Sequence, residues 1–299
     1  MEMKRVRPNF RRGVYVIPTS LTILNLFFGF RAIVYATRAI ESIAVGRSEA
    51  AIDFFETACL SLLFAAVFDT FDGMIARQLN ATSEFGKEYD SLADVVTFGC
   101  APAVLVYAWG LHSFEKLGGG IAFLFLAAVS LRLARFNVMT GKTDYRYFVG
   151  LPSPAGALTI ASMIFYAPAP VTDRRFAFIV MLVTVATAFS MISPIRYRSQ
   201  KGLALQKERS LIYFLILALI LALAFKWPRE FWFIGAIGYL VSGPLVKLWS
   251  IAFPSPSLPP SLPVDESSSR PVGESSSRPV DEASSLREEP AVPSTPPAP

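Results

Sequence analysis

Residues 58–77 read ACLSLLFAAVFDTFDGMIAR, an apolar run that ends in two aspartates and an arginine. The run belongs to a longer stretch, 50–78, which exceeds the roughly 20 mostly apolar residues that a membrane-spanning helix needs. Ionisable groups at membrane depth are costly, and they usually face a cavity or the interior of a helical bundle. The stretch therefore predicts a membrane helix with a functional site at its end.

The composition of the whole chain also indicates a membrane protein. Of its 299 residues, 53% are hydrophobic and 17% are charged, whereas soluble domains carry about 25% charged residues. We expect an all-α, polytopic membrane bundle of about eight transmembrane helices. The expected spans lie at about 17–37, 50–78, 91–111, 119–138, 151–168, 175–195, 210–226 and 230–250.

The composition changes at about residue 254. Beyond it, VDESSSRP at 264–271 recurs as VGESSSRP at 272–279, in a segment rich in Pro, Ser and Glu. Such a segment has too little apolar surface to form a core. We therefore expect a membrane domain over 1–253 and a disordered tail over 254–299.

The distribution of basic residues predicts the orientation of the bundle. The N-terminal arm and the even-numbered connections carry about twice as many Lys and Arg residues as the connections on the other side. We therefore expect a protein of the cytoplasmic membrane with both termini in the cytoplasm. The net charge of the chain is +5. Its basic residues lie at the ends of apolar runs, which favours contact with membrane lipids and argues against nucleic-acid binding.

A second acidic pair follows the first after a short connection. Asp69 and Asp72 lie roughly 60° apart on one helix face, and Asp90 and Asp94 lie roughly 40° apart on the next helix. The connection is short enough to make the two helices antiparallel neighbours. The two acidic faces are therefore expected to meet.

Carboxylates that face one another cannot all stay ionised without cations. The ligands are hard oxygens without His or Cys, so Mg²⁺, Mn²⁺ or Ca²⁺ suits them better than zinc. Two such ions are a common device for clamping a pyrophosphate during an in-line displacement. Gly73 and Ala76 share the acidic face and leave room for a bulky ligand, and Arg77 offers a fixed charge to a phosphate oxygen.

The full spacing, Asp69-x2-Asp72-Gly73-x2-Ala76-Arg77-x8-Gly86-x3-Asp90-x3-Asp94, resembles the complete signature of the CDP-alcohol phosphatidyltransferase family. The resemblance implies an integral membrane enzyme, usually a homodimer, that replaces the CMP of a CDP-linked lipid with an alcohol at a metal site facing the cytoplasm. It implies that the four aspartates bind two metal ions, Mg²⁺ or Mn²⁺, and that Asp94 also deprotonates the attacking hydroxyl. Gly73, Ala76, Arg77 and Gly86 would then line the CDP-lipid site.

Four other segments resemble the bacterial and archaeal membrane-type branch of this family that uses serine. They are IPTSLTILNLFFG at 17–29, LRLARFN at 131–137, FVGLPSPA at 148–155 and SPIRY at 193–197, in which Pro194 departs from the usual pattern. This resemblance implies CDP-diacylglycerol and L-serine as substrates. Glycerol 3-phosphate or an inositol phosphate is the alternative acceptor, and a cation transporter with intramembrane aspartates is the alternative class of protein.

The residues themselves allow serine as the acceptor. Its carboxylate requires a cation, and Arg132 and Arg135 are spaced to face roughly the same way. Asn137 and Ser153 would assist them. The competing interpretation is that these arginines reach out to lipid phosphates.

The first expected span carries three polar or small residues on one face. Thr22, Asn25 and Gly29 share that face. We expect it to serve close packing between helices rather than contact with a ligand.

Overall fold

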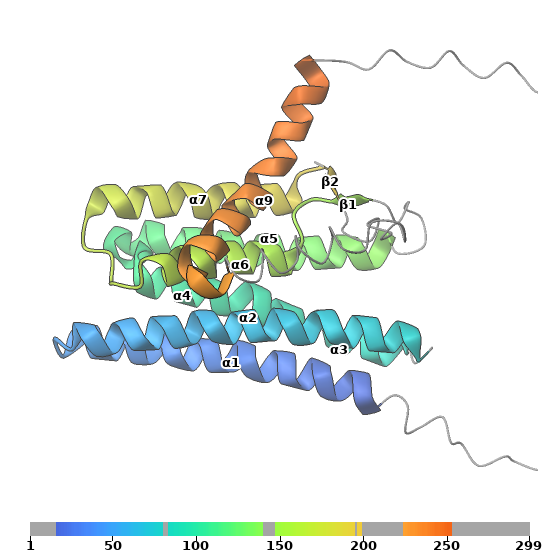
Figure 1. Ribbon diagram of the computed structural model, residues 1–299, viewed down its shortest axis with the longest axis horizontal. Helices are drawn as coiled ribbons and strands as arrows, with labels where there is room; N and C mark the ends of the chain where they lie inside the picture. The colour runs from blue at the N-terminus through green and yellow to red at the C-terminus, as the bar shows by residue number, and fades with distance from the viewer. Residues whose placement is uncertain (1–15, 80–82, 140–146, 195, 199–223, 253–299) are drawn as a thin grey trace, which may run out of the picture. The chain divides into compact units, whose positions relative to one another are not determined.

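The computed structural model describes residues 16–79, 83–139, 147–194, 196–198 and 224–252. Within them the chain is almost entirely helical (Figure 1). Its longer helices are α1 (Val16–Ala44), α2 (Ser48–Gln78), α3 (Glu84–Asp94), α4 (Ala101–Trp109), α5 (Glu115–Met139), α6 (Ser153–Tyr166), α7 (Arg174–Ile192) and α9 (Pro228–Ala252). The expected all-α membrane bundle is confirmed.

Six helical segments in the described part are long and apolar enough to cross a membrane: Pro18–Ala44, Ser48–Ile75, Glu84–Trp109, Leu111–Val138, Arg174–Ile192 and Pro228–Trp249. The expected span at 151–168 is the shorter helix α6, which has 14 residues. Prolines bound it on both sides, at Pro152 and Pro168. Most of the expected span at 210–226, and the tail from 254, lie outside the described residues.

Two short strands depart from the purely helical prediction. β1 (Tyr147–Val149) pairs antiparallel with β2 (Arg196–Arg198), with Phe148 opposite Tyr197. The pair joins the segment that precedes α6 to the segment that follows α7. Gly150, directly after β1, has a φ of +84°, and a Cβ there would lie 2.2 Å from the carbonyl oxygen of Met191. Glycine therefore permits the close passage of this segment over the end of α7.

Helices α1 and α2 run side by side and are joined by a tight turn (Figure 1). Gly46 makes that turn with a φ of +75°. Small residues of α1, Ala32, Ala36 and Ala39, are fully buried at the helical spacing that forms one stripe. They pack in one core cluster with Ala51, Phe55, Ala58 and Leu62 of α2. Small side chains let two membrane helices approach closely, so α1 and α2 form a tightly packed helix pair.

The span that contains α3 is interrupted by a π-helical turn, η2 (Val95–Cys100), before it continues as α4. The interruption lies directly after Asp94. It faces α1, where a Cβ on Gly29 would lie 2.4 Å from Oγ1 of Thr97 and 2.7 Å from its Cα. Oγ1 of Thr97 also donates a hydrogen bond of 3.3 Å to the backbone carbonyl of Asn25. The missing side chain at Gly29 thus brings α1 into contact with the span that carries the second acidic pair.

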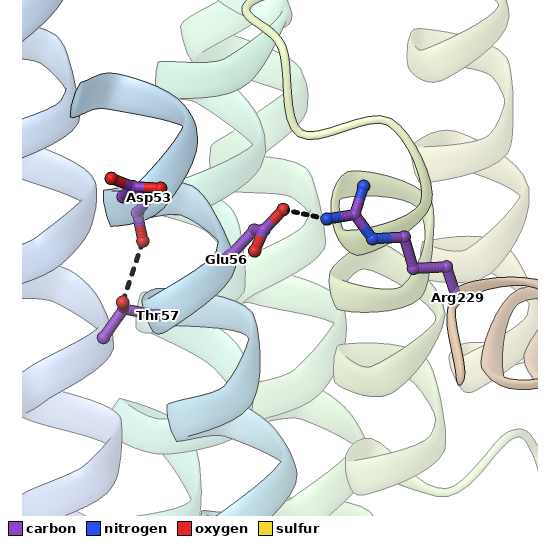
Figure 2. A network of polar contacts seen from close by, with 4 residues as sticks. All are labelled: Asp53, Glu56, Thr57 and Arg229. Atoms are coloured by element: carbon purple, nitrogen blue, oxygen red, sulfur yellow. Dashed lines mark hydrogen bonds and ion pairs between the residues drawn. The ribbon is translucent and has the colours of Figure 1, made fainter. Parts of the chain in front are cut away.

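Helix α9 contacts the bundle through Arg229. Arg229 of α9 forms an ion pair with Glu56 of α2 (Figure 2). The same guanidinium lies 5.7 Å from the ring centroid of Phe165 in α6. On α2, Thr57 donates a hydrogen bond of 2.8 Å to the backbone carbonyl of Asp53, one turn earlier. Arg229 therefore connects α9 to two helices of the bundle.

Candidate active site

The four aspartates come from the ends of two helices. Asp69 and Asp72 lie in the last turns of α2, and Asp90 and Asp94 lie at the end of α3, where the helix passes into η2. Asp72 and Asp94 are buried, with exposed fractions of 5% and 8%, and the other two are half-buried. The predicted meeting of the two acidic faces is confirmed by the structure.

Three of the four carboxylates form a compact group. One oxygen from each of Asp69, Asp72 and Asp90 lies within 4.8 Å of the others. Oδ1 of Asp90 is buried and has no hydrogen-bond partner among the described residues. A buried, unpartnered carboxylate oxygen beside two other carboxylates is the arrangement that a hard divalent cation would complete. The residues present therefore fit an oxygen-coordinated metal.

Asp94 adjoins this group through Asp69 and is also held from α1. Nδ2 of Asn25 in α1 donates a hydrogen bond of 3.2 Å to Oδ1 of Asp94. Thr22, one turn earlier in α1, donates a hydrogen bond of 3.1 Å from Oγ1 to Oδ2 of Asp72. Both α1 side chains are buried. The face of α1 that we expected only to pack thus also holds two of the carboxylates.

Sequence reasoning identified Thr22 and Asn25 as part of a packing face, which the close approach at Gly29 bears out, but it did not predict their hydrogen bonds to the aspartates. Their partners lie 50 and 69 residues away in the chain. Polar residues spaced three apart on an apolar helix were the available signal, because a buried Asn or Thr in a membrane helix needs a polar partner. The partner itself could not be deduced from the spacing.

The residues expected around the CDP-lipid are only partly described. Gly73 follows Asp72 directly in α2, and Ala76 and Arg77 lie in the last turns of the same helix, although their side chains are outside the described part. Gly86 lies in the first turn of α3, where its N–H donates a hydrogen bond of 2.9 Å to Oγ of the N-cap residue Ser83. Ser83 thereby fixes the start of the helix that carries Asp90 and Asp94.

The two arginines of α5, either of which we expected to be able to bind the serine carboxylate, have different hydrogen-bond partners. Arg132 is buried, with an exposed fraction of 9%, and its guanidinium donates a hydrogen bond to Oγ of Ser153, at the start of α6. It also interacts electrostatically with Asp94 and, more weakly, with Asp69. Its Nε is buried without a partner among the described residues. Arg132 and Ser153 therefore lie close to the acidic residues.

Arg135 and Asn137 make other contacts. Arg135 donates a hydrogen bond of 2.8 Å to the backbone carbonyl of Ile192, the last residue of α7. Asn137 donates a hydrogen bond of 2.9 Å to Oγ of Ser91 in α3. Arg135 thus satisfies a carbonyl at a helix C-terminus, where a cation is electrostatically favoured, and Asn137 connects α5 to α3.

Comparison with known proteins identifies the family. The sequence matches the CDP-alcohol phosphatidyltransferase family over residues 15–190, which include both acidic helices and the α1 residues that contact them. The chain belongs to this family. The family predicted from the spacing of the aspartates is therefore confirmed.

Several curated CDP-alcohol phosphatidyltransferase relatives are similar to the chain. The CDP-diacylglycerol–serine O-phosphatidyltransferase of Helicobacter pylori is 31% identical over 222 residues, which cover 73% of this chain and 84% of the relative. The protein of the same name from Bacillus subtilis is 32% identical over 183 residues, or 60% of this chain and 89% of the relative. The archaetidylserine synthase of Methanothermobacter thermautotrophicus is 39% identical over 148 residues, which cover 49% of this chain and 60% of the relative.

Proposed function

We propose that the protein transfers a phosphatidyl group from CDP-diacylglycerol to L-serine, releasing CMP and phosphatidylserine. The observation that carries the choice of acceptor is the buried Arg132–Ser153 pair beside the aspartates. A guanidinium with a free, buried N–H is suited to receive the carboxylate of an amino acid. The names of the relatives from Helicobacter pylori and Bacillus subtilis support the same acceptor.

We place metal binding at the compact carboxylate group, which comes from the ends of α2 and α3. Asp69, Asp72 and Asp90 would hold Mg²⁺ or Mn²⁺, with room for a contribution from one oxygen of Asp94. Bound there, two ions would neutralise charge on the pyrophosphate and make CMP a better leaving group. On the protein side, the residues that follow Asp72, namely Gly73, Ala76 and Arg77, together with Gly86, would bind the CDP end of the lipid.

Asp94 is the proposed general base. The serine hydroxyl is a weak nucleophile at neutral pH, so a positioned base must take its proton while the new bond to phosphorus forms. Asp94 is held by Asn25 through one oxygen and lies beside Asp69 of the compact carboxylate group. Its other oxygen would accept the proton. The serine oxygen bonds to the lipid phosphorus, and the bond from that phosphorus to the CMP oxygen breaks in the same displacement, without a covalent enzyme intermediate.

Several features of the proposed function rest on the family resemblance and the charge pattern. We place the enzyme in the cytoplasmic membrane, with both termini and the active site facing the cytoplasm, on the basis of the basic residues in the connections. We also propose that it is a homodimer. Mass measurement of the purified protein in detergent tests the dimer, and labelling of single cysteines from either side of the membrane tests the orientation.

The deciding experiment is an acceptor assay on purified protein. CMP release from CDP-diacylglycerol is measured with L-serine, glycerol 3-phosphate or inositol 1-phosphate in the presence of Mg²⁺ or Mn²⁺. We expect release with L-serine only. Release with either phosphate-bearing acceptor, and none with serine, would overturn the acceptor while leaving family membership intact.

The assignment of Asp94 is tested separately. Asp94→Asn should lower kcat far more than it lowers the affinity for CDP-diacylglycerol, because a base acts in the transition state. A variant that keeps kcat and loses only lipid binding would show that Asp94 is a ligand and not the base.

A further inference from the structure

Asn25 has one buried amide oxygen that none of the interactions described above uses. The side chain is fully buried, and its Oδ1 has no hydrogen-bond partner among the described residues. A buried acceptor without a partner costs about 1–3 kcal/mol. Such an atom next to a functional group is therefore a candidate for contact with a ligand.

The orientation of the amide follows from its neighbour. An ionised carboxylate only accepts hydrogen bonds, so the side chain of Asn25 must present its NH₂ group to Asp94, as the 3.2 Å contact has it. The backbone carbonyl of Asn25 accepts from Thr97, which fixes the position of this turn of α1 against η2. Oδ1 is consequently held in the side chain that contacts Asp94, and it has no partner among the described residues.

The position of this oxygen corresponds to the chemistry of serine. The amide nitrogen and oxygen of Asn25 are bonded to the same carbon, so Oδ1 belongs to the same small group that contacts the carboxylate proposed to receive the hydroxyl proton. In serine, the hydroxyl and the ammonium groups are carried by neighbouring carbons. An acceptor that brings its hydroxyl to Asp94 therefore brings its ammonium to the same side of the site as Asn25.

We propose that Asn25 recognises the ammonium group of the acceptor: its amide nitrogen holds Asp94, and its amide oxygen accepts a hydrogen bond from the amino alcohol. Arg132 would take the carboxylate of the same molecule. The inference rests on the proposed function, because it requires an amino acid as the acceptor. It makes α1 the helix that distinguishes an amino alcohol from a hydroxy acid or a phosphate-bearing alcohol.

The test compares two acceptors that differ only in the amino group. L-Serine and 3-hydroxypropionate have the same hydroxyl and carboxylate, and kcat/KM is measured for both with wild-type protein and with Asn25→Leu. The substitution removes both polar atoms of the amide and keeps the branching and the number of heavy atoms of the side chain. Loss of the hydrogen bond from Asn25 to Asp94 lowers kcat/KM for both acceptors alike. The ratio of the two kcat/KM values therefore reports the ammonium contact alone.

We expect wild-type protein to prefer serine, and Asn25→Leu to reduce that preference by about tenfold or more, which is the value of a hydrogen bond to a charged group. Thr97→Val is the matched control, because it removes a hydrogen bond to the backbone of Asn25 and leaves the amide in place. It should keep the wild-type preference.

An unchanged preference in Asn25→Leu, with both acceptors slowed equally, would overturn the proposal and leave Asn25 as a positioning residue for Asp94. If turnover by the variant is too slow to measure, the two acceptors are compared by the rise in Tm that each gives with protein loaded with CDP-diacylglycerol. Serine should lose its advantage there, and a retained advantage would contradict the proposal. Failure of wild-type protein to use serine at all would instead refute the proposed function.

Discussion

Oγ1 of Thr22 lies 3.1 Å from Oδ2 of Asp72, so the first transmembrane helix holds a carboxylate that is carried by the second. The two residues are 50 positions apart in the chain. Asn25 repeats the arrangement one turn later with Asp94 of α3. Helix α1 therefore fixes the orientation of one carboxylate from each acidic pair.

Removal of the Thr22 hydroxyl should impair activity without unfolding the protein. We expect Thr22→Val to lower kcat/KM by about tenfold, because residues that orient metal-binding carboxylates typically contribute that much. Thr37→Val is the control, since Thr37 lies on the same helix and its hydroxyl donates a hydrogen bond to the carbonyl of Val34, away from the aspartates. Equal activities of the two variants would show that the contact with Asp72 does not orient the site.

The compact carboxylate group should be necessary for metal binding. We expect Asp69→Asn and Asp90→Asn each to lower activity by about 100-fold or more and to weaken Mn²⁺ binding, because each removes an anionic ligand from the group. Mn²⁺ binding is measured by electron paramagnetic resonance alongside turnover. Asp53→Asn, a change on the same helix outside the group, should alter neither quantity. Normal turnover by either site variant at ordinary metal concentration would refute the metal assignment.

The two arginines of α5 should respond differently to the same substitution. We expect Arg132→Gln to raise the KM for serine by about tenfold or more, because a buried cation beside Ser153 is lost. Arg135→Gln should mainly lower Tm, by an amount that corresponds to about 1 kcal/mol, since its hydrogen bond to Ile192 ends a helix. Steady-state kinetics and thermal unfolding in detergent separate the two. A raised KM in Arg135→Gln with none in Arg132→Gln would reverse the assignment.

The approach of α1 to η2 should depend on the absence of a side chain at Gly29. We expect Gly29→Ala to destabilise the protein by about 1–3 kcal/mol, the usual cost of overpacking, and to lower activity by displacing Asn25 from Asp94. Gly120→Ala is the control, because a Cβ at Gly120 meets nothing within 4 Å among the described residues. A Gly29→Ala protein with wild-type Tm and activity would show that α1 tolerates a larger separation from η2.

The ion pair between Glu56 and Arg229 should contribute to stability and not to catalysis. The side chains are 26% and 45% exposed, so we expect the pair to contribute about 0.2–1 kcal/mol. A double-mutant cycle with Glu56→Gln and Arg229→Gln, measured by Tm, isolates the interaction. Loss of turnover in either single variant, at unchanged Tm, would contradict a purely structural role.

The sequence by itself determined the class of the protein and the identity of its acidic residues. Apolar runs of sufficient length can be stable only as helices in a bilayer, because their backbone groups must bond within the segment. Helical periodicity then places Asp69 beside Asp72, and Asp90 beside Asp94, whatever the rest of the fold does. The short connection between α2 and α3 is enough to bring the two pairs together.

Periodicity alone does not give the neighbour that covers a helix face. Arg132 and Arg135 are three residues apart, and either was expected to be able to bind the serine carboxylate; Arg132 contacts Ser153, and Arg135 contacts the end of α7. The helical angle between them is roughly 60°, the same as between Asp69 and Asp72, so the surroundings of α5 decide their different neighbours. Their different partners depend on the packing of α5 against α6 and α7, which cannot be predicted from the spacing of residues within α5.

The role of α1 was decided by tertiary structure for the same reason. The sequence shows that Thr22 and Asn25 share a face, and it permits both packing and polar contact on that face. The packing of α1 against α2, together with its close passage at Gly29 over the π-helical turn after Asp94, places the two side chains within hydrogen-bond distance of carboxylates. Local sequence fixes which groups a helix presents, and the packing of helices distant in the chain fixes what those groups contact.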